Sequence, residues 1–187
     1  STIDKHPLIS SLLGSGFQPQ PPFCSDSERI DTLLAPLDQT HVVDADSSQA
    51  IATEETRRGR NLVIQGPPGT GKSQTIANII ATAVRAGKKV LFVAEKMAAL
   101  SVVKRRFDNI GLGDICLELH SAKANKKFVL QELERTLALG APKQENTEQQ
   151  AAQLTKLREQ LNRHVADLHV PLEPSGLTPF VIIGEVC

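Results

Sequence analysis

The residues best suited to chemistry lie at 66–73 and read G-P-P-G-T-G-K-S. Their spacing matches G-x-x-x-x-G-K-[ST], in which the glycines let successive backbone N–H groups turn towards one anion. In this pattern Lys72 reaches the β- and γ-phosphates of a nucleotide, and the Ser73 hydroxyl binds Mg²⁺. We therefore predict a nucleotide-phosphate site with Lys72 and Ser73 as catalytic residues and Ser73 as the metal ligand.

The local context of the loop agrees with this prediction. An apolar run at 61–65 precedes it, and a helix-forming run follows it, so the helix would add its positive N-terminal end to the site. The alternative is a glycine-rich turn with a chance Lys-Ser pair. The residues predicted to bind the nucleotide within this segment are Gly66, Pro67, Pro68, Gly69, Thr70, Gly71, Lys72, Ser73 and Gln74.

Strands and helices are expected to alternate around the loop. A helix with an Asp46–Gln49 capping box and a terminal Gly59 comes first. The order strand, crossover helix, strand is typical of a parallel sheet, so the expected fold class is α/β. The expected strands are 61–65, 89–94 and 114–119, and the expected helices between and after them are 72–86, 97–110 and 124–139.

The two ends of the chain have a different character. Residues 1–40 are expected to form a weakly ordered extension, residues 41–140 the nucleotide-binding domain, and residues 141–187 a helical arm that is cut short. Leucines and one valine between 148 and 170 follow a heptad spacing, which indicates either an intramolecular helical hairpin or a dimeric coiled coil. A last helix is expected from Thr178, with Pro179 at its first position.

Composition narrows the class of protein. The net charge is zero, but residues 85–127 carry ten Lys/Arg against four Asp/Glu, which favours contact with phosphates or a solvated basic face. The three cysteines are far apart, which argues against a disulfide framework or a zinc site. Without a secretory leader or a long apolar run, the protein is expected to be soluble and cytoplasmic.

The loop "GPPGTGKS" resembles that of superfamily 1 DNA and RNA helicases, and in particular the branch with the RNA-decay helicases. The resemblance implies a partial RecA-like P-loop domain that uses ATP and Mg²⁺. In that branch an upstream glutamine, the Q motif, contacts adenine, and Gln49 stands in the corresponding place. An amide both donates and accepts, so it suits adenine; the alternative is a glutamine that only caps its helix.

Two further segments resemble helicase motifs that bind the nucleic-acid backbone at strand ends. They are "VLFVAEKMAALSVVKRRF" and "LELHSAKANKK". The first departs from the family pattern because Glu95 and Lys96 replace the usual small residues. The resemblance implies that the residues near bound single-stranded DNA or RNA are Glu95, Lys96, His120, Ser121, Lys123 and Lys126.

Residues 40–187 as a whole look like one group of large bacterial helicase-like proteins, in which a helical arm interrupts the first motor domain. A motor also needs an acidic pair at the end of a later strand and arginines from a second domain. Glu54–Glu55, Glu95 and Glu118 are not suitably placed. We therefore expect an N-terminal fragment that binds ATP weakly, hydrolyses little alone, works with the rest of its helicase chain, and self-associates through a sheet edge or the heptads.

The sequence is also compatible with two other functions. One is a different P-loop enzyme, either a small-molecule kinase or another ATPase, which would not need selectivity for adenine at Gln49. The other is a non-enzymatic assembly module in which the heptad helix binds a partner.

Overall fold

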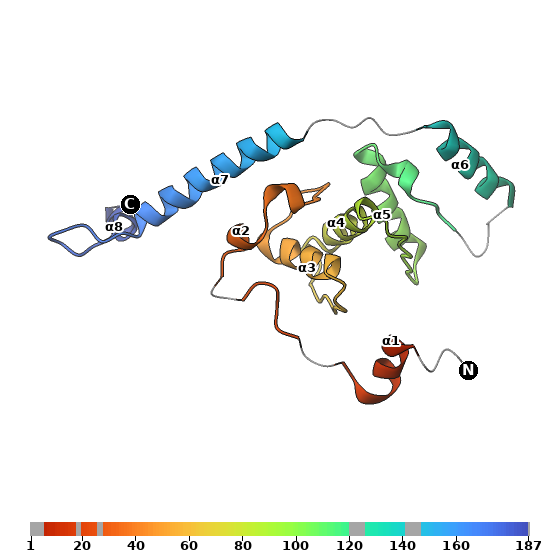
Figure 1. Cartoon of the computed structure of the whole chain (residues 1–187), viewed down its shortest axis with the longest axis horizontal. Coiled ribbons are helices and arrows are strands. Elements are labelled where there is room, and N and C mark those ends of the chain that lie inside the picture. Colours follow the sequence, from red (N-terminus) through yellow and green to blue (C-terminus); the bar gives the residue numbers. More distant parts are fainter. Residues whose placement is uncertain (1–5, 18–19, 26–27, 120–125, 141–146, 187) are drawn as a thin grey trace.

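The computed structural model describes residues 6–17, 20–25, 28–119, 126–140 and 147–186, and these residues are largely helical (Figure 1). Three helices form a central group, with the others around it. The helices in chain order are α1 Pro7–Ser10, the π-helix η2 Ser11–Ser15, α2 Ile30–Leu33, the 3₁₀ helix η3 Pro36–Asp38, α3 Ser47–Arg57, α4 Lys72–Arg85, α5 Met97–Asn109, the 3₁₀ helix η4 Gly113–Ile115, α6 Lys126–Ala138, α7 Glu148–Leu168 and α8 Pro179–Val186.

The expectation of a parallel sheet is wrong for the part of the chain that the structure describes. Its only β-type pairing is one antiparallel bridge between Leu172 and Leu177. The runs 61–65 and 89–94 are irregular, and η4 occupies part of the third expected strand. Val63 is 90% exposed and Leu91 86% exposed, so these apolar side chains are not covered. The expected sheet edge, and the self-association argued from it, is therefore withdrawn.

A physical reason for this error lies in the range of the interactions. A helix closes its hydrogen bonds within four residues, so its formation follows local sequence. A parallel strand needs a partner that lies a dozen or more residues away. Apolar β-branched composition predicts that a segment is suited to pairing, but it does not supply the partner.

The hydrophobic core forms where α4 and α5 pack together, and α3 packs against α4 (Figure 1). Phe107 on α5 is fully buried and packs with Val103 against Ala77 and Ala81 on α4. The small alanine side chains let the two helices approach, and the ring fills the space between them. Burial of the Phe107 side chain contributes about 2–3 kcal/mol by its apolar area alone.

A second set of contacts joins the segment before α3 to the middle of α4. Asn78 is fully buried, and its Oδ1 accepts hydrogen bonds from the Val42 and Val43 amides at 2.9 and 3.1 Å. Its Nδ2 donates to the Val43 carbonyl at 3.0 Å. The side chain therefore replaces a strand partner for these backbone groups, which would otherwise lose their hydrogen bonds on burial.

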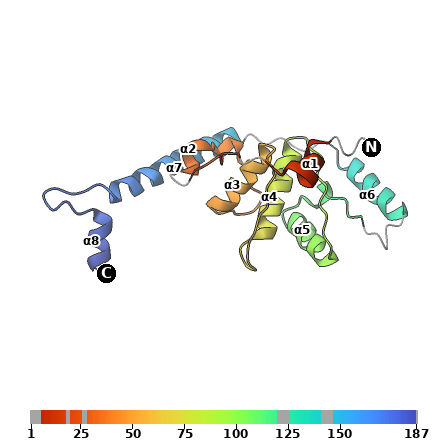
Figure 2. The same cartoon turned by 90° about the horizontal axis from the view of Figure 1, so that it is seen from below.

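The remaining helices lie outside this core. Arg135 on α6 pairs with Asp114 at η4. The helix α7 projects from the central group, and the turn after it leads to α8 (Figures 1 and 2). The predicted cap of α8 is confirmed, because the Val181 amide donates to Thr178 Oγ1 at 3.3 Å. None of the described helices is both long and apolar enough to cross a membrane.

Candidate functional site

The loop at 66–73 bends where glycine permits it. Gly69 and Gly71 have φ values of 90° and 74°, which other residues rarely adopt. Thr70, which lies between these two glycines, closes a turn: its hydroxyl donates to the Pro67 carbonyl at 2.9 Å. A Cβ at Gly71 would also lie 2.6 Å from Gln74 Oε1, so that side chain would have to move to accept a larger residue.

The loop leads directly into the N-terminus of α4. Gly71 is the N-cap residue and provides no side-chain hydrogen bond to the helix. The first amide N–H groups of a helix have no acceptor within the helix, and the helix dipole places partial positive charge there. The end of α4 that faces the loop is therefore suited to an anion.

Lys72, the first residue of α4, folds back over the loop. Its Nζ donates to the carbonyl oxygens of Gly66 and Pro67 at 2.5 and 2.6 Å. The ammonium group therefore lies inside the bend of the loop, which is the place where the sequence pattern predicts a phosphate. An incoming phosphate would exchange these two carbonyl contacts for charge-assisted hydrogen bonds, which are stronger.

Gln49, at the start of α3, both caps its own helix and contacts the loop. Its Oε1 accepts from the Asp46 amide at 3.3 Å, and its own amide donates to Asp46 Oδ1 at 2.8 Å, which completes the predicted capping box. Its Nε2 donates to the Thr70 carbonyl in the loop at 3.1 Å. The structure therefore brings Gln49 against the loop, and its contact with adenine stays a prediction.

Ser73 has a partner that the sequence did not indicate. Arg106 on α5 donates from Nε to Ser73 Oγ at 3.1 Å. Arg106 directly precedes the buried Phe107, so the packing of α5 on α4 directs its side chain towards the loop. The nearest signal in the sequence was the apolar spacing of 103 and 107, which predicted the buried face but not its neighbour.

The described residues among those predicted to contact nucleic acid lie at the starts of two different helices. Glu95 and Lys96 are exposed at the start of α5, where Lys96 is the N-cap residue. Lys126 is exposed at the first position of α6. His120, Ser121 and Lys123 lie outside the described residues. The structure therefore does not test whether the six residues lie together, and their contacts with nucleic acid stay predictions.

The adjacent carboxylates of Glu54 and Glu55 on α3 form ion pairs with arginines close to them in the sequence. Burial would raise the pKa of Glu54, but hydrogen bonds from Arg57 and Arg58 at 2.6–2.7 Å outweigh burial and lower the pKa below its usual range. Glu55 is buried and accepts from the Phe23 amide at 2.6 Å, with Arg60 Nε 2.7 Å from its other oxygen. Both carboxylates are therefore committed to arginines on or just after α3.

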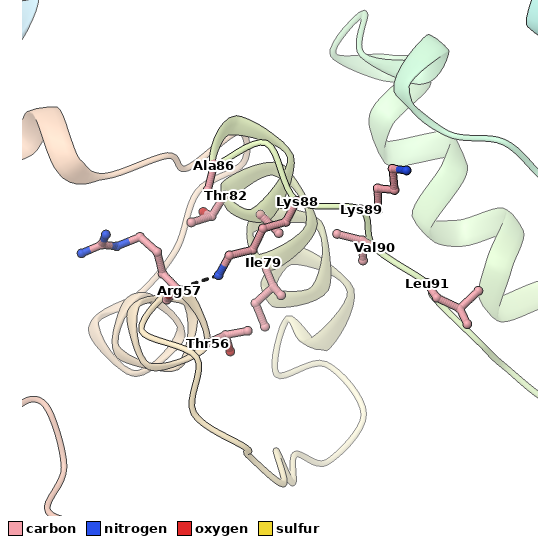
Figure 3. Close-up of a pocket in the computed structure, with 10 residues that line it drawn as sticks. Thr56, Arg57, Ile79, Thr82, Ala86, Lys88, Lys89, Val90 and Leu91 are labelled. Carbon is pink, nitrogen blue, oxygen red and sulfur yellow. Dashed lines mark hydrogen bonds between the residues drawn. The ribbon is translucent and has the colours of Figure 1, made fainter. Parts of the chain in front are cut away.

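A cavity lies at the opposite end of α4 (Figure 3). Its volume is about 270 Å³, and it opens between α3, α4 and the segment 88–91. Lys88 reaches across it and donates to the Arg57 carbonyl at 3.5 Å, while Lys89 points away. The cavity shares no residue with the loop, so it is separate from the candidate phosphate site.

Comparison with known proteins gives one family. The AAA domain family matches residues 44–170 of the chain. This match contains α3, the loop, α4, α5, α6 and α7.

Three curated proteins are similar over shorter stretches. The Uncharacterized ATP-dependent helicase MG140 of Mycoplasma genitalium is 46% identical over 82 residues, which is 44% of this chain and 7% of that protein. Its homolog in Mycoplasma pneumoniae is 56% identical over 46 residues, which is 25% of this chain and 4% of that protein. Helicase SEN1 of Saccharomyces cerevisiae is 32% identical over 78 residues, which is 42% of this chain and 3% of that protein. The chain thus spans less than a tenth of the length of these relatives, and no solved structure matches it.

Proposed function

Because this chain belongs to the AAA domain family, we propose that residues 66–73 bind the triphosphate of ATP within a protein of helicase-like, ATP-dependent function. The family match and the similarity to proteins named helicases confirm the resemblance to superfamily 1 helicases that the loop suggested. The observation that carries the proposal is the position of Lys72 Nζ, inside the bend of the loop and at the N-terminus of α4.

Charge supports this assignment. The N-terminus of α4 and the Lys72 ammonium place positive charge on one concave backbone. The carboxylates of α3 are paired with Arg57, Arg58 and Arg60 instead of the loop. A triphosphate would neutralise this charge and accept hydrogen bonds from the loop amides.

Mg²⁺ fits the donors that the site offers. The Ser73 hydroxyl provides one oxygen, and Mg²⁺ usually takes its other ligands from phosphates and water. The described residues contain no group of three or more His, Cys, Asp or Glu side chains placed for a metal ion. We therefore assign Mg²⁺ to Ser73 together with the nucleotide, and not to a separate protein site.

The activity of the whole protein is part of the same proposal. We infer that the parent chain couples ATP hydrolysis to movement on DNA or RNA, and that this segment alone binds ATP without efficient turnover. The chain supplies the loop, whereas the acidic pair and the second-domain arginines that a motor needs are not assigned within it. Glu95, Lys96 and Lys126 are the proposed contacts to the nucleic-acid backbone among the described residues.

Calorimetric titration of the full chain with Mg-ATP tests the binding step. We expect Lys72→Ala to weaken ATP binding by about tenfold or more, because a charge-assisted contact to phosphate is lost. Lys89→Ala is the matched control, since it removes the same charge from the segment after α4 and should leave the affinity unchanged. Equal affinities in the two variants would refute the proposed phosphate site.

Selectivity for adenine separates a helicase-like protein from other P-loop enzymes. Gln49→Ala should reduce the preference for ATP over GTP if the amide contacts the base. Because Gln49 also caps α3, Asp46→Ala is the control: it breaks the capping box and leaves the Gln49 amide in place. A loss of selectivity in both variants, or in neither, would remove Gln49 as a base contact.

A further inference from the structure

Among the residues that the structure describes, Arg106 is the arginine that contacts the loop. Five other arginines of the described chain pair with carboxylates, namely Arg57, Arg58, Arg60, Arg135 and Arg158. Arg106 instead donates to a neutral group, the Ser73 hydroxyl, at 3.1 Å. Its charge is thus directed to the residue that follows Lys72.

The packing of α5 determines this position. Phe107 and Val103 are buried against Ala77 and Ala81, which fixes the rotation of α5 about its own axis. Arg106 is half-buried beside them, whereas Arg105 on the same turn is exposed. Holding a guanidinium in one place lowers the entropy that it loses on binding an anion.

Ser73 therefore lies in the first turn of α4 and beside the Arg106 guanidinium, and the Lys72 ammonium lies over the same loop. A guanidinium has five N–H donors in a planar fork that matches phosphate oxygens, and the bond to Ser73 uses one of them. Two cations on one loop repel each other, and an anion bound between them would remove this repulsion. A polyphosphate is the anion whose size and charge match the loop and both side chains.

We propose that Arg106 is a second cationic ligand of the nucleotide phosphates, positioned by its hydrogen bond to Ser73 and supplied by α5. This assignment rests on the proposed ATP site and adds a residue that the loop pattern does not contain. It also connects the phosphates to α5, which begins next to Glu95 and Lys96.

Calorimetry with ATP, with and without Mg²⁺, tests the assignment in the full chain. Arg106→Ala should weaken ATP binding by about tenfold in both conditions, because a charged hydrogen bond to phosphate is lost. Arg105→Ala removes the same charge one residue away and should leave the affinity within about twofold of the original. Equal affinities in these two variants would overturn the assignment.

Two milder variants separate charge from structure. Arg106→Gln keeps a donor for Ser73 without charge, so ATP affinity should fall about tenfold; Arg106→Lys keeps the charge and should lose about threefold. Circular dichroism and unfolding free energies should match the original protein in both. If Arg106→Gln binds ATP as tightly as the original protein, Arg106 only supports Ser73.

The same titrations separate a failure of the proposed ATP site from a failure of the Arg106 assignment. If the original protein binds ATP and Lys72→Ala abolishes binding, the proposed site stands, and the Arg106 variants alone decide this inference. If the original protein and Lys72→Ala behave alike, the proposed ATP site fails and the Arg106 assignment fails with it.

Discussion

Two regions of the molecule carry apolar residues at helical spacing. One is the central group of α3, α4 and α5, here called the layer, and the other is the arm formed by α7 and α8. The two regions bury these residues to very different extents. In the layer, Ala77 and Phe107 are fully buried. On α7 the seam residues Leu154, Leu157 and Leu161 are about half to two-thirds exposed. The same type of pattern therefore gave a packed core in one region and an open face in the other.

The difference shows that spacing predicts a face but not its partner. In the layer, alanines on α4 provide room for the Phe107 ring, and Asn78 joins the preceding segment by three hydrogen bonds. The arm is attached at few points, chiefly by Arg158, which donates to the Leu34 carbonyl at 2.8 Å. Burial contributes free energy only where a complementary surface is in place.

The largest effect is expected from Phe107→Ala. Removing the ring leaves a cavity between α4 and α5 and should destabilise the layer by about 3–5 kcal/mol. Leu161→Ala on α7 is the matched test, with an expected loss below about 0.5 kcal/mol because the side chain is already exposed. Urea unfolding followed by circular dichroism measures both, and similar losses would contradict the contrast between the two regions.

Asn78→Ala should have the next largest effect. It would leave the amides of Val42 and Val43 and one carbonyl without their partner, which costs about 2 kcal/mol. Asn162→Ala, on the less buried α7, should cost about 0.5 kcal/mol or less. Chemical denaturation of the two variants gives the comparison, and a stable Asn78→Ala protein would mean that water replaces the side chain.

Acid should weaken the layer more than the arm. The pKa of Glu54 is lowered in the folded chain, so its stabilisation is present above the usual glutamate pKa and is lost as pH falls through the lowered value. The effect is at most about 1 kcal/mol for each ion pair, because Arg57 and Arg58 are two-fifths exposed.

Unfolding free energies at neutral and acidic pH measure this dependence. Glu54→Gln should flatten it, whereas Glu159→Gln on the exposed surface of α7 should leave it unchanged. An equally steep pH dependence in Glu54→Gln would assign the effect to other carboxylates.

The smallest effect on stability is expected from Arg158→Ala. Arg158 also lies 3.2 Å from Asp31, but the contact is near the surface, so the layer should lose about 0.5 kcal/mol or less. The arm should instead become more sensitive to limited proteolysis within α7, because Arg158 no longer attaches this helix to the segment near η3. Arg163→Ala on the same helix is the control, and an unchanged cleavage rate would show that other contacts attach the arm.

Much of the helical structure could be predicted from local sequence. The capping box of Asp46 and Gln49, the start of α4 at Lys72 and the Thr178 cap of α8 were all predicted correctly. The strands at 61–65, 89–94 and 114–119 were not, because their apolar composition indicated pairing and the structure provides no ladder for the described residues. Pairing depends on distant segments, which spacing within one segment cannot reveal.

Some residues of the candidate site could be predicted from the sequence, and others could not. Gly69, Gly71 and Lys72 were identified from their types and spacing, and the structure shows the bend that they form. Arg106 was missed because it lies 33 residues from Ser73 and approaches it only through the packing of α5 on α4. The bond from Gln49 to Thr70, across 21 residues, was likewise outside the reach of a local pattern.

The sequence by itself determined the glycine-rich bend at 66–73 and the ends of most helices, since these depend on backbone geometry and hydrogen bonds among near neighbours. Only the tertiary structure decided which apolar faces are buried, which arginine reaches Ser73, and that the expected strands are unpaired. Such contacts require distant segments to meet, and they form only where complementary shape and charge outweigh the chain entropy that is lost.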